Sequence, residues 1–234
     1  MNETKRATLL IGSPRGLAST SESLGTYVLQ RLREHGLETG KAYVNPSLNS
    51  DKNREALLRL VDISDLLILA FPLYVDSLPS RVVAALELIA EHKRAVNVPK
   101  RRRLVAIVNS GFPEARQSDT ALAICRRFAK EAELDWAGGL ALGGGQLIAG
   151  RALAEVGGVV RNVMKALDLT AAAVAEGELV PKEAADLMAK PLLPSRLYIW
   201  LANRRWNRQI REYGTRPRLY DRPYLVGPVG PEPT

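Results

Sequence analysis

Residues 12–21 connect an apolar run to the start of a helical pattern and are rich in hydrogen-bond donors. The residues in this loop that could contact a ligand are Ser13, Pro14, Arg15, Ser19, Thr20 and Ser21. The first N–H groups of a helix have no partner within the helix and favour an anion, and an arginine adds a charge-assisted hydrogen bond. The loop therefore favours a phosphate; the alternative is that Ser19, Thr20 and Ser21 only cap the helix.

The same loop lacks two known nucleotide motifs. It contains neither the Gly-x-Gly-x-x-Gly of dinucleotide sites nor the Gly-x4-Gly-Lys-Ser/Thr of nucleotide triphosphatases. Without that lysine and a magnesium-binding partner, the loop suits a terminal monophosphate better than a triphosphate.

Two more loops with binding chemistry follow apolar runs. Residues 66–71 are followed by Pro72, Leu73, Tyr74, Val75 and Asp76, and residues 104–108 by Asn109, Ser110, Gly111 and Phe112. A planar ring could stack on the first loop, and Gly111 in the second would let a ligand approach the backbone. The alternative for the first loop is a proline-bounded turn with Tyr74 packing on the surface.

Short apolar runs alternate with helical patterns along most of the chain. Strands are expected at 7–11, 41–44, 66–71, 104–108 and 136–142, and helices at 21–33, 51–61, 80–91, 117–132 and 151–167. This alternation predicts an α/β fold with a doubly wound parallel sheet. Ligands bind at the carboxyl ends of such strands, which would bring the three loops to one edge.

The composition changes after residue 168, so we expect a binding domain at 1–168 and a helical extension at 169–234. In the extension we expect a short helix at 181–189, a helix from Ser195 to Tyr213 and a proline-rich arm. The formal net charge is +8, and most of the excess lies between residues 190 and 222, so the basic character belongs to the extension. No nucleic-acid contact is expected.

The helix expected at 195–213 is both aromatic and arginine-rich. It fits a contact with a partner subunit, where such residues are common anchors, and it also fits a peripheral contact with an anionic membrane. We prefer the subunit contact at this point. A second basic segment, Lys100–Arg103, is expected to be a solvated loop.

Several classes of site are not expected. The single cysteine, Cys125, cannot form a disulfide within the chain or a cluster of thiolates, and we expect it to be buried and inert. We expect no metal and identify no catalytic acid or base; His35 and His92 are expected on helix surfaces. The chain begins without a signal-peptide pattern, so a cytoplasmic location is expected.

The three loops together resemble those of the NAD(P)H-dependent FMN reductase family of flavodoxin-like proteins, over about residues 7–150. The motifs are Gly-Ser-Pro-Arg followed by Ser-Thr-Ser, then Pro-Leu-Tyr-Val-Asp-Ser-Leu-Pro, then Asn-Ser-Gly. The resemblance implies five strands in the order 2-1-3-4-5. It implies that the loop at 12–21 binds the FMN phosphate, that 72–76 border the isoalloxazine and ribityl chain, and that 109–112 contact the pyrimidine side of the ring.

The resemblance also implies a function. FMN and NAD(P)H would be the cofactors, with hydride passing from nicotinamide to bound FMN and two electrons then passing to a quinone, a nitro or azo compound, or a flavin. It implies a homodimer or homotetramer. The alternatives are a flavodoxin-type electron carrier and a non-catalytic, membrane-associated flavin-binding protein. The sequence leaves open the acceptor and the choice between NADH and NADPH.

Overall fold

The structure is a computed structural model that describes residues 5–96, 102–218 and 220–222. The chain divides into two compact units, Met1–Leu193 and Pro194–Thr234. Each unit is described by itself.

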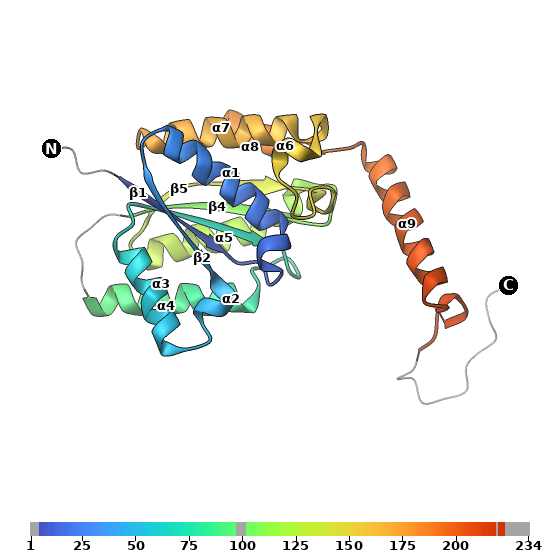
Figure 1. Ribbon diagram of the computed structural model, residues 1–234, viewed down its shortest axis with the longest axis horizontal. Helices are drawn as coiled ribbons and strands as arrows, with labels where there is room; N and C mark the ends of the chain where they lie inside the picture. The colour runs from blue at the N-terminus through green and yellow to red at the C-terminus, as the bar shows by residue number, and fades with distance from the viewer. Residues whose placement is uncertain (1–4, 97–101, 219, 223–234) are drawn as a thin grey trace. The chain divides into compact units, whose positions relative to one another are not determined.

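The first unit contains one five-stranded parallel sheet in the order β2-β1-β3-β4-β5 (Figure 1). The strands are β1 Arg6–Ile11, β2 Glu38–Tyr43, β3 Leu66–Pro72, β4 Arg103–Asn109 and β5 Asp135–Leu142. The doubly wound, flavodoxin-like arrangement predicted for the chain is confirmed.

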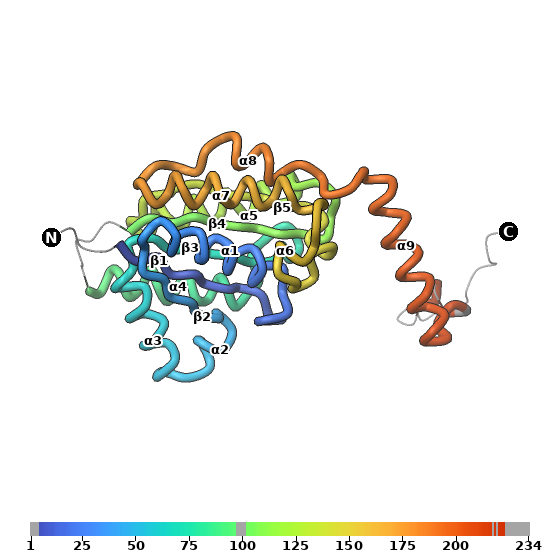
Figure 2. The backbone as a smooth tube through the Cα atoms, turned by 45° about the horizontal axis from the view of Figure 1, so that its top comes forward, coloured from blue at the N-terminus to red at the C-terminus, as the bar shows by residue number. Residues whose placement is uncertain are grey.

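Helices cover both faces of this sheet (Figures 1 and 2). They are α1 Thr20–Glu34, α2 Val44–Ser47, α3 Asp51–Asp62, α4 Ser80–Val96, α5 Asp119–Glu131, α6 Leu153–Val156, α7 Arg161–Ala175 and α8 Lys182–Met188. One apolar layer joins the sheet to α1, α7 and α8, and the other joins it to α3, α4 and α5.

The central strand β3 shows how the sequence builds both layers. Successive side chains of a strand point to opposite faces, so Ile68 and Ala70 belong to the layer beneath α1, while Leu69 and Phe71 belong to the layer beneath α4. All four are almost fully buried, as expected for a strand covered on both faces. Cys125 of α5 is also fully buried, and burial raises the pKa of its thiol to about 12; the expected buried position is confirmed.

The second strand differs from its prediction. It was expected at 41–44, but β2 begins at Glu38 and ends at Tyr43, and Val44 begins α2. Because β2 lies at the edge of the sheet, only Ala42 within it is buried, which weakens its apolar pattern. On the neighbouring helices, Ala56 and Val83 are exposed although both are apolar.

The segment after β5 is more broken than the helix expected at 151–167. It forms α6, a turn at Gly157 with φ +83°, and then α7. Few residues other than glycine adopt such a φ, so Gly157 separates the two helices. The compact unit continues to Leu193, and the expected boundary at 168 falls within α7.

The chain between α7 and α8 follows the outer edge of β5. The N–H of Val180 donates to the carbonyl of Ala137 at 2.7 Å. A Cβ at Gly138 would lie 2.6 Å from the Cβ of Val180, so only a glycine allows this close approach. Helix α8 then packs beside β5 and α7.

The second unit contains α9, Ser195–Glu212, which ends just before Gly214 with φ +62°. The helix expected from Ser195 to Tyr213 thus begins at Ser195 and ends one residue earlier, at Glu212. Within the described residues, no helix is both long enough and apolar enough to cross a membrane.

Candidate functional site

The three candidate loops meet around Asn109 at the carboxyl edge of the sheet. The side-chain amide of Asn109 donates to the hydroxyl of Ser21 at 2.8 Å and to the carbonyl of Phe71 at 3.1 Å. The carbonyl of Asn109 accepts from the N–H of Leu73 at 2.8 Å. One buried residue therefore ties the ends of β3 and β4 to the first turn of α1.

The hydroxyls at the start of α1 bond within the protein. Ser19 caps the helix: its Oγ accepts from the N–H of Glu22 at 3.1 Å and donates to the carbonyl of Gly16 at 2.7 Å. Thr20 donates its hydroxyl to the carbonyl of Gly145 at 2.7 Å. The N–H of Glu22 is taken by this cap. The N–H groups of Thr20 and Ser21 have no carbonyl within the helix to bond to, so they are the donors that α1 directs outward.

The tip of the first loop is open. Pro14 and Arg15 are exposed, and no described acceptor bonds to the Arg15 guanidinium, while the Arg15 N–H donates to Ser13 Oγ at 3.4 Å. Just before them, Gly12 fits tightly, because a Cβ there would lie 2.3 Å from Val82 Cγ2. A tightly packed turn thus presents an exposed cation beside the helix N-terminus.

The loop after β3 ends in a tight hairpin. Tyr74 and Ser77 exchange both main-chain hydrogen bonds, at 2.9 and 3.0 Å. The two residues between them have left-handed backbones, with φ +48° at Val75 and +57° at Asp76. Turns of this kind favour Asn-Gly, and a β-branched residue is strained there. Val75 is also 97% exposed.

A fourth loop, after β5, completes this edge. The N–H of Gly144 donates to the carbonyl of Phe112 at 2.6 Å, and that of Gly145 to the carbonyl of Ser110 at 2.8 Å. A Cβ at Gly143 would lie 2.3 Å from the carbonyl oxygen of Pro113. The sequence analysis missed this loop, for which three glycines in succession after a strand were the available signal of close contact between loops.

Large apolar side chains are exposed on these loops. They are Leu17, Tyr74, Val75 and Phe112. Pro72 and Leu73 are half-buried beside them, whereas Asn109 and Ser110 are buried. The edge therefore combines outward N–H groups and a free guanidinium with an apolar surface, which suits a ligand that has an anionic end and a flat apolar part.

A cavity of about 340 Å³ lies away from this edge, between the outer side of α1 and the α6 segment. Its cation, Arg31, is paired with Glu34 at 2.6 Å and with Asp168 at 3.0 Å. Nearby, the buried Glu22 accepts from Lys41 at 2.7 Å. Burial lowers the pKa of Lys41, but its contacts with Glu22 and Tyr43 together outweigh burial and leave that pKa raised. The charges around α1 are thus matched internally.

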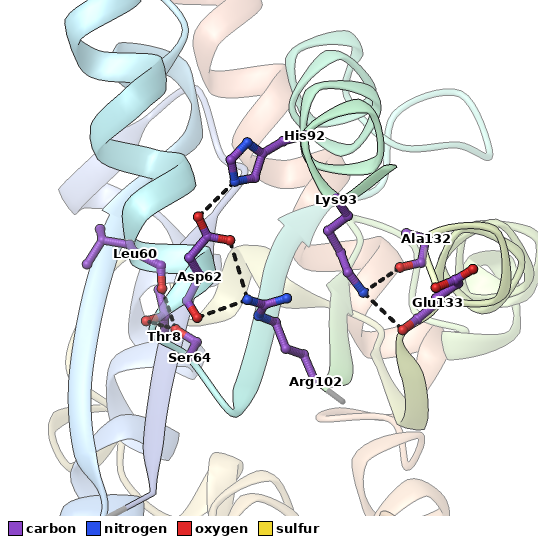
Figure 3. A network of polar contacts seen from close by, with 9 residues as sticks. All are labelled: Thr8, Leu60, Asp62, Ser64, His92, Lys93, Arg102, Ala132 and Glu133. Carbon is purple, nitrogen blue, oxygen red and sulfur yellow. Dashed lines mark hydrogen bonds and ion pairs between the residues drawn. The ribbon is translucent and has the colours of Figure 1, made fainter. Parts of the chain in front are cut away.

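The basic segment before β4 is not a solvated loop where it is described. Lys100 and Arg101 lie outside the described residues, but Arg102 is fully buried (0% exposed). Its Nη2 donates to the carbonyl of Asp62 at 2.9 Å and lies 3.3 Å from Asp62 Oδ1 (Figure 3). His92, expected on the surface, is half-buried with Nε2 2.7 Å from the other Asp62 oxygen. The expectation of a solvated loop was wrong because a run of basic residues does not show which side chain turns inward at the start of a strand.

No protein-family model matches the chain, and no curated protein matches it. Solved structures match its fold. An FMN-dependent NADH-azoreductase from Bacillus anthracis, in complex with FMN, is 12% identical, with a TM-score of 0.51 over 74% of this chain and 100% of that one. The Trp repressor binding protein from Bacillus subtilis is 11% identical, with a TM-score of 0.52 over 69% and 96%.

A third similar structure is an NADH:FMN oxidoreductase in its apo form. It is 14% identical, with a TM-score of 0.50 over 82% of this chain and 97% of that one. At these identities the similarity shows a common fold.

Proposed function

We propose that the chain is an FMN-dependent oxidoreductase that takes electrons from NADH or NADPH and passes them to a small acceptor. The observation that carries this proposal is the junction at Asn109, where three loops and the N-terminus of α1 meet at the carboxyl edge. Two proteins of the same fold are named for FMN and NADH.

The residues at this edge fit the phosphate of FMN. The Arg15 guanidinium and the Ser13 hydroxyl would hold it, together with the N–H groups of Thr20 and Ser21. No described acceptor bonds to these donors. The hydroxyls of Ser19 and Thr20 would act indirectly, since both donate to main-chain carbonyls and fix the shape of the loop.

The exposed apolar side chains fit the flavin ring. Tyr74 and Phe112 would border it, with Pro72, Leu73, Val75 and Asp76 forming the wall on the β3 side. Ser110 and Gly111 would contact its polar edge through the backbone. Asn109 would position these groups, because both of its amide bonds go to the protein.

A bound flavin would supply the two-electron chemistry, so the protein needs no acid or base of its own. The chain would bind the cofactor, orient it and shield one of its faces from water. The acceptor would be a quinone, a nitro or azo compound, or a flavin. Further copies of the chain, in a homodimer or homotetramer, would cover the exposed apolar side chains of the loops.

An absorption spectrum of the purified protein, followed by anaerobic additions of NADPH and then NADH, tests the proposal. We expect flavin bands that bleach within the mixing time with one of the two donors. A flavin that binds but stays oxidised with both donors would contradict the reductase and favour an electron carrier. Failure to bind added FMN would contradict the site itself.

Replacement of Arg15 tests the phosphate contact. A charge-assisted hydrogen bond contributes about 1.5–3 kcal/mol, so Arg15→Ala should weaken FMN roughly 10- to 100-fold and leave riboflavin, which has no phosphate, nearly unchanged. Dissociation constants from flavin fluorescence would measure both. Arg126→Ala, an exposed arginine on α5, is the matched control, and equal losses for the two flavins would contradict the assignment.

A further inference from the structure

Helix α9 has an apolar stripe in which Ile199, Trp206 and Tyr213 are exposed, whereas Ala202 and Ile210 are half-buried. Residues three and four positions apart lie on one face of a helix, and the stripe consists of Ile199, Ala202, Trp206, Ile210 and Tyr213. Trp206 is 60% exposed and Tyr213 78% exposed. The first two turns also expose Leu197, Trp200 and Leu201. A helix that showed this much apolar surface to water alone would be unusual in a soluble domain.

A second face of the same helix begins with Leu197 and Leu201 and is basic in its C-terminal part. Arg204, Arg208 and Arg211 follow one another at the same helical spacing, and the acidic residue of the helix, Glu212, comes only at its end. The Arg208 side chain lies 2.8 Å from that carboxylate, and the Arg204 guanidinium lies 5.5 Å from the centre of the Trp200 ring. Arginines beside tryptophan and isoleucine form the pattern of a helix that lies in a membrane interface.

The charge of the rest of the chain narrows the choice of partner. Residues 194–234 contain eight arginines and three acidic residues, and residues 1–193 also contain more basic than acidic residues, 25 against 22. A second copy of this chain therefore offers α9 no opposite net charge, whereas an anionic bilayer does. Helix α9 is too polar to cross a bilayer, and its 18 residues span about 27 Å, long enough to lie along the surface.

We propose that α9 binds anionic membrane surfaces, with the stripe of Ile199, Trp206, Ile210 and Tyr213 at the level of the lipid headgroups and Arg204, Arg208 and Arg211 against their phosphates. This replaces the subunit contact through α9 that the sequence alone favoured, because a second copy offers this helix no opposite net charge. The proposal does not depend on flavin chemistry and would hold for the protein with or without FMN.

Co-sedimentation of the full chain with vesicles tests the proposal. We expect binding to phosphatidylcholine vesicles that contain phosphatidylglycerol, weak binding to phosphatidylcholine alone, and release as salt is raised. A surface arginine contributes roughly fivefold to such binding. The variant Arg204→Gln/Arg208→Gln/Arg211→Gln should therefore lose about a hundredfold in vesicle affinity.

The variant Arg126→Gln/Arg127→Gln/Lys130→Gln is the matched control, because it removes three exposed charges from α5 and should bind vesicles with little loss. In Trp136→Phe/Trp200→Phe protein, which keeps a single tryptophan, lipids brominated in their acyl chains should quench Trp206 emission. Equal losses for the two triple variants, or no quenching, would overturn the proposal. The proposal would also be overturned if the parent protein did not bind vesicles and the α9 variant differed from it in oligomeric mass. That result would establish the subunit contact.

Discussion

The amino ends and the carboxyl ends of the parallel strands form two edges of the sheet, the amino edge and the carboxyl edge. These two edges use similar polar residues in opposite ways. At the amino edge, Arg102 is buried on Asp62, which also contacts His92, and Lys93 donates to the carbonyls of Ala132 and Glu133 (Figure 3). Burial and the charge of Arg102 lower the pKa of Lys93. Each of these cations is committed to an internal partner.

At the carboxyl edge the groups committed to internal partners within the three candidate loops are neutral. Asn109, Ser19 and Thr20 bond to the protein, while Arg15 stays exposed without a described acceptor. The amino edge therefore contributes to stability, and the carboxyl edge keeps a cation and main-chain donors for a ligand. Charge by itself does not identify a binding site; the difference lies in whether a charge already has a partner.

The largest effect should come from breaking the amino edge. Asp62→Ala would leave Arg102 buried without its carboxylate, and loss of one member of a buried pair costs about 3–5 kcal/mol. Urea denaturation should show a fall of about 3 kcal/mol in the free energy of unfolding, because Asp62 itself is partly exposed. FMN affinity should be unchanged.

The matched control is Asp51→Ala, on the same helix α3. The Asp51 carboxylate is 90% exposed in its contact with Arg54, and an exposed pair contributes at most about 1 kcal/mol. Similar losses for the two aspartate variants, or weaker FMN binding only in Asp62→Ala, would show that the two edges are not separate in function.

A smaller effect should follow from forcing apart the loops of the carboxyl edge. In Gly143→Ala the new Cβ would meet the Pro113 carbonyl, a main-chain group that cannot rotate away, and overpacking typically costs about 1–3 kcal/mol. We expect a loss of about 2 kcal/mol in stability together with weaker FMN binding. Gly158→Ala is the control, since nothing lies within 4 Å of its Cβ position; if it behaves like Gly143→Ala, the contact between loops is not the cause.

The smallest effect should come from removing backbone strain in the hairpin after β3, at the carboxyl edge. Val75→Asn/Asp76→Gly supplies the residues that this turn favours, and left-handed backbones at other residues cost about 1 kcal/mol or more. Thermal or urea unfolding should show a gain of about 1 kcal/mol. Val75→Thr keeps the β-branch and should gain nothing; equal stability for both variants would mean that the turn is not strained.

The sequence predicts the fold well because alternation of apolar runs and helical patterns is a long-range signal. It also predicts which loops meet, because parallel strands end at one edge. It does not reveal that the Asn109 amide turns inward to Ser21 and Phe71, since hydrogen-bond direction depends on tertiary contacts. Nor does it distinguish Arg102 from its basic neighbours, because burial at the start of a strand is set by what packs beneath the sheet.

The hydrogen bond between Val180 and Ala137 has a consequence for assembly. Unpaired edge strands are templates on which another chain can add a strand, a route to aggregation. On β5 that route is obstructed, because Val180 occupies a ladder position and lies against Gly138. The edge strand on the other side of the sheet, β2, presents the charged residues Glu38 and Lys41, which discourage the addition of another strand. Copies of this chain should therefore associate through helices and loops and not by extending the sheet.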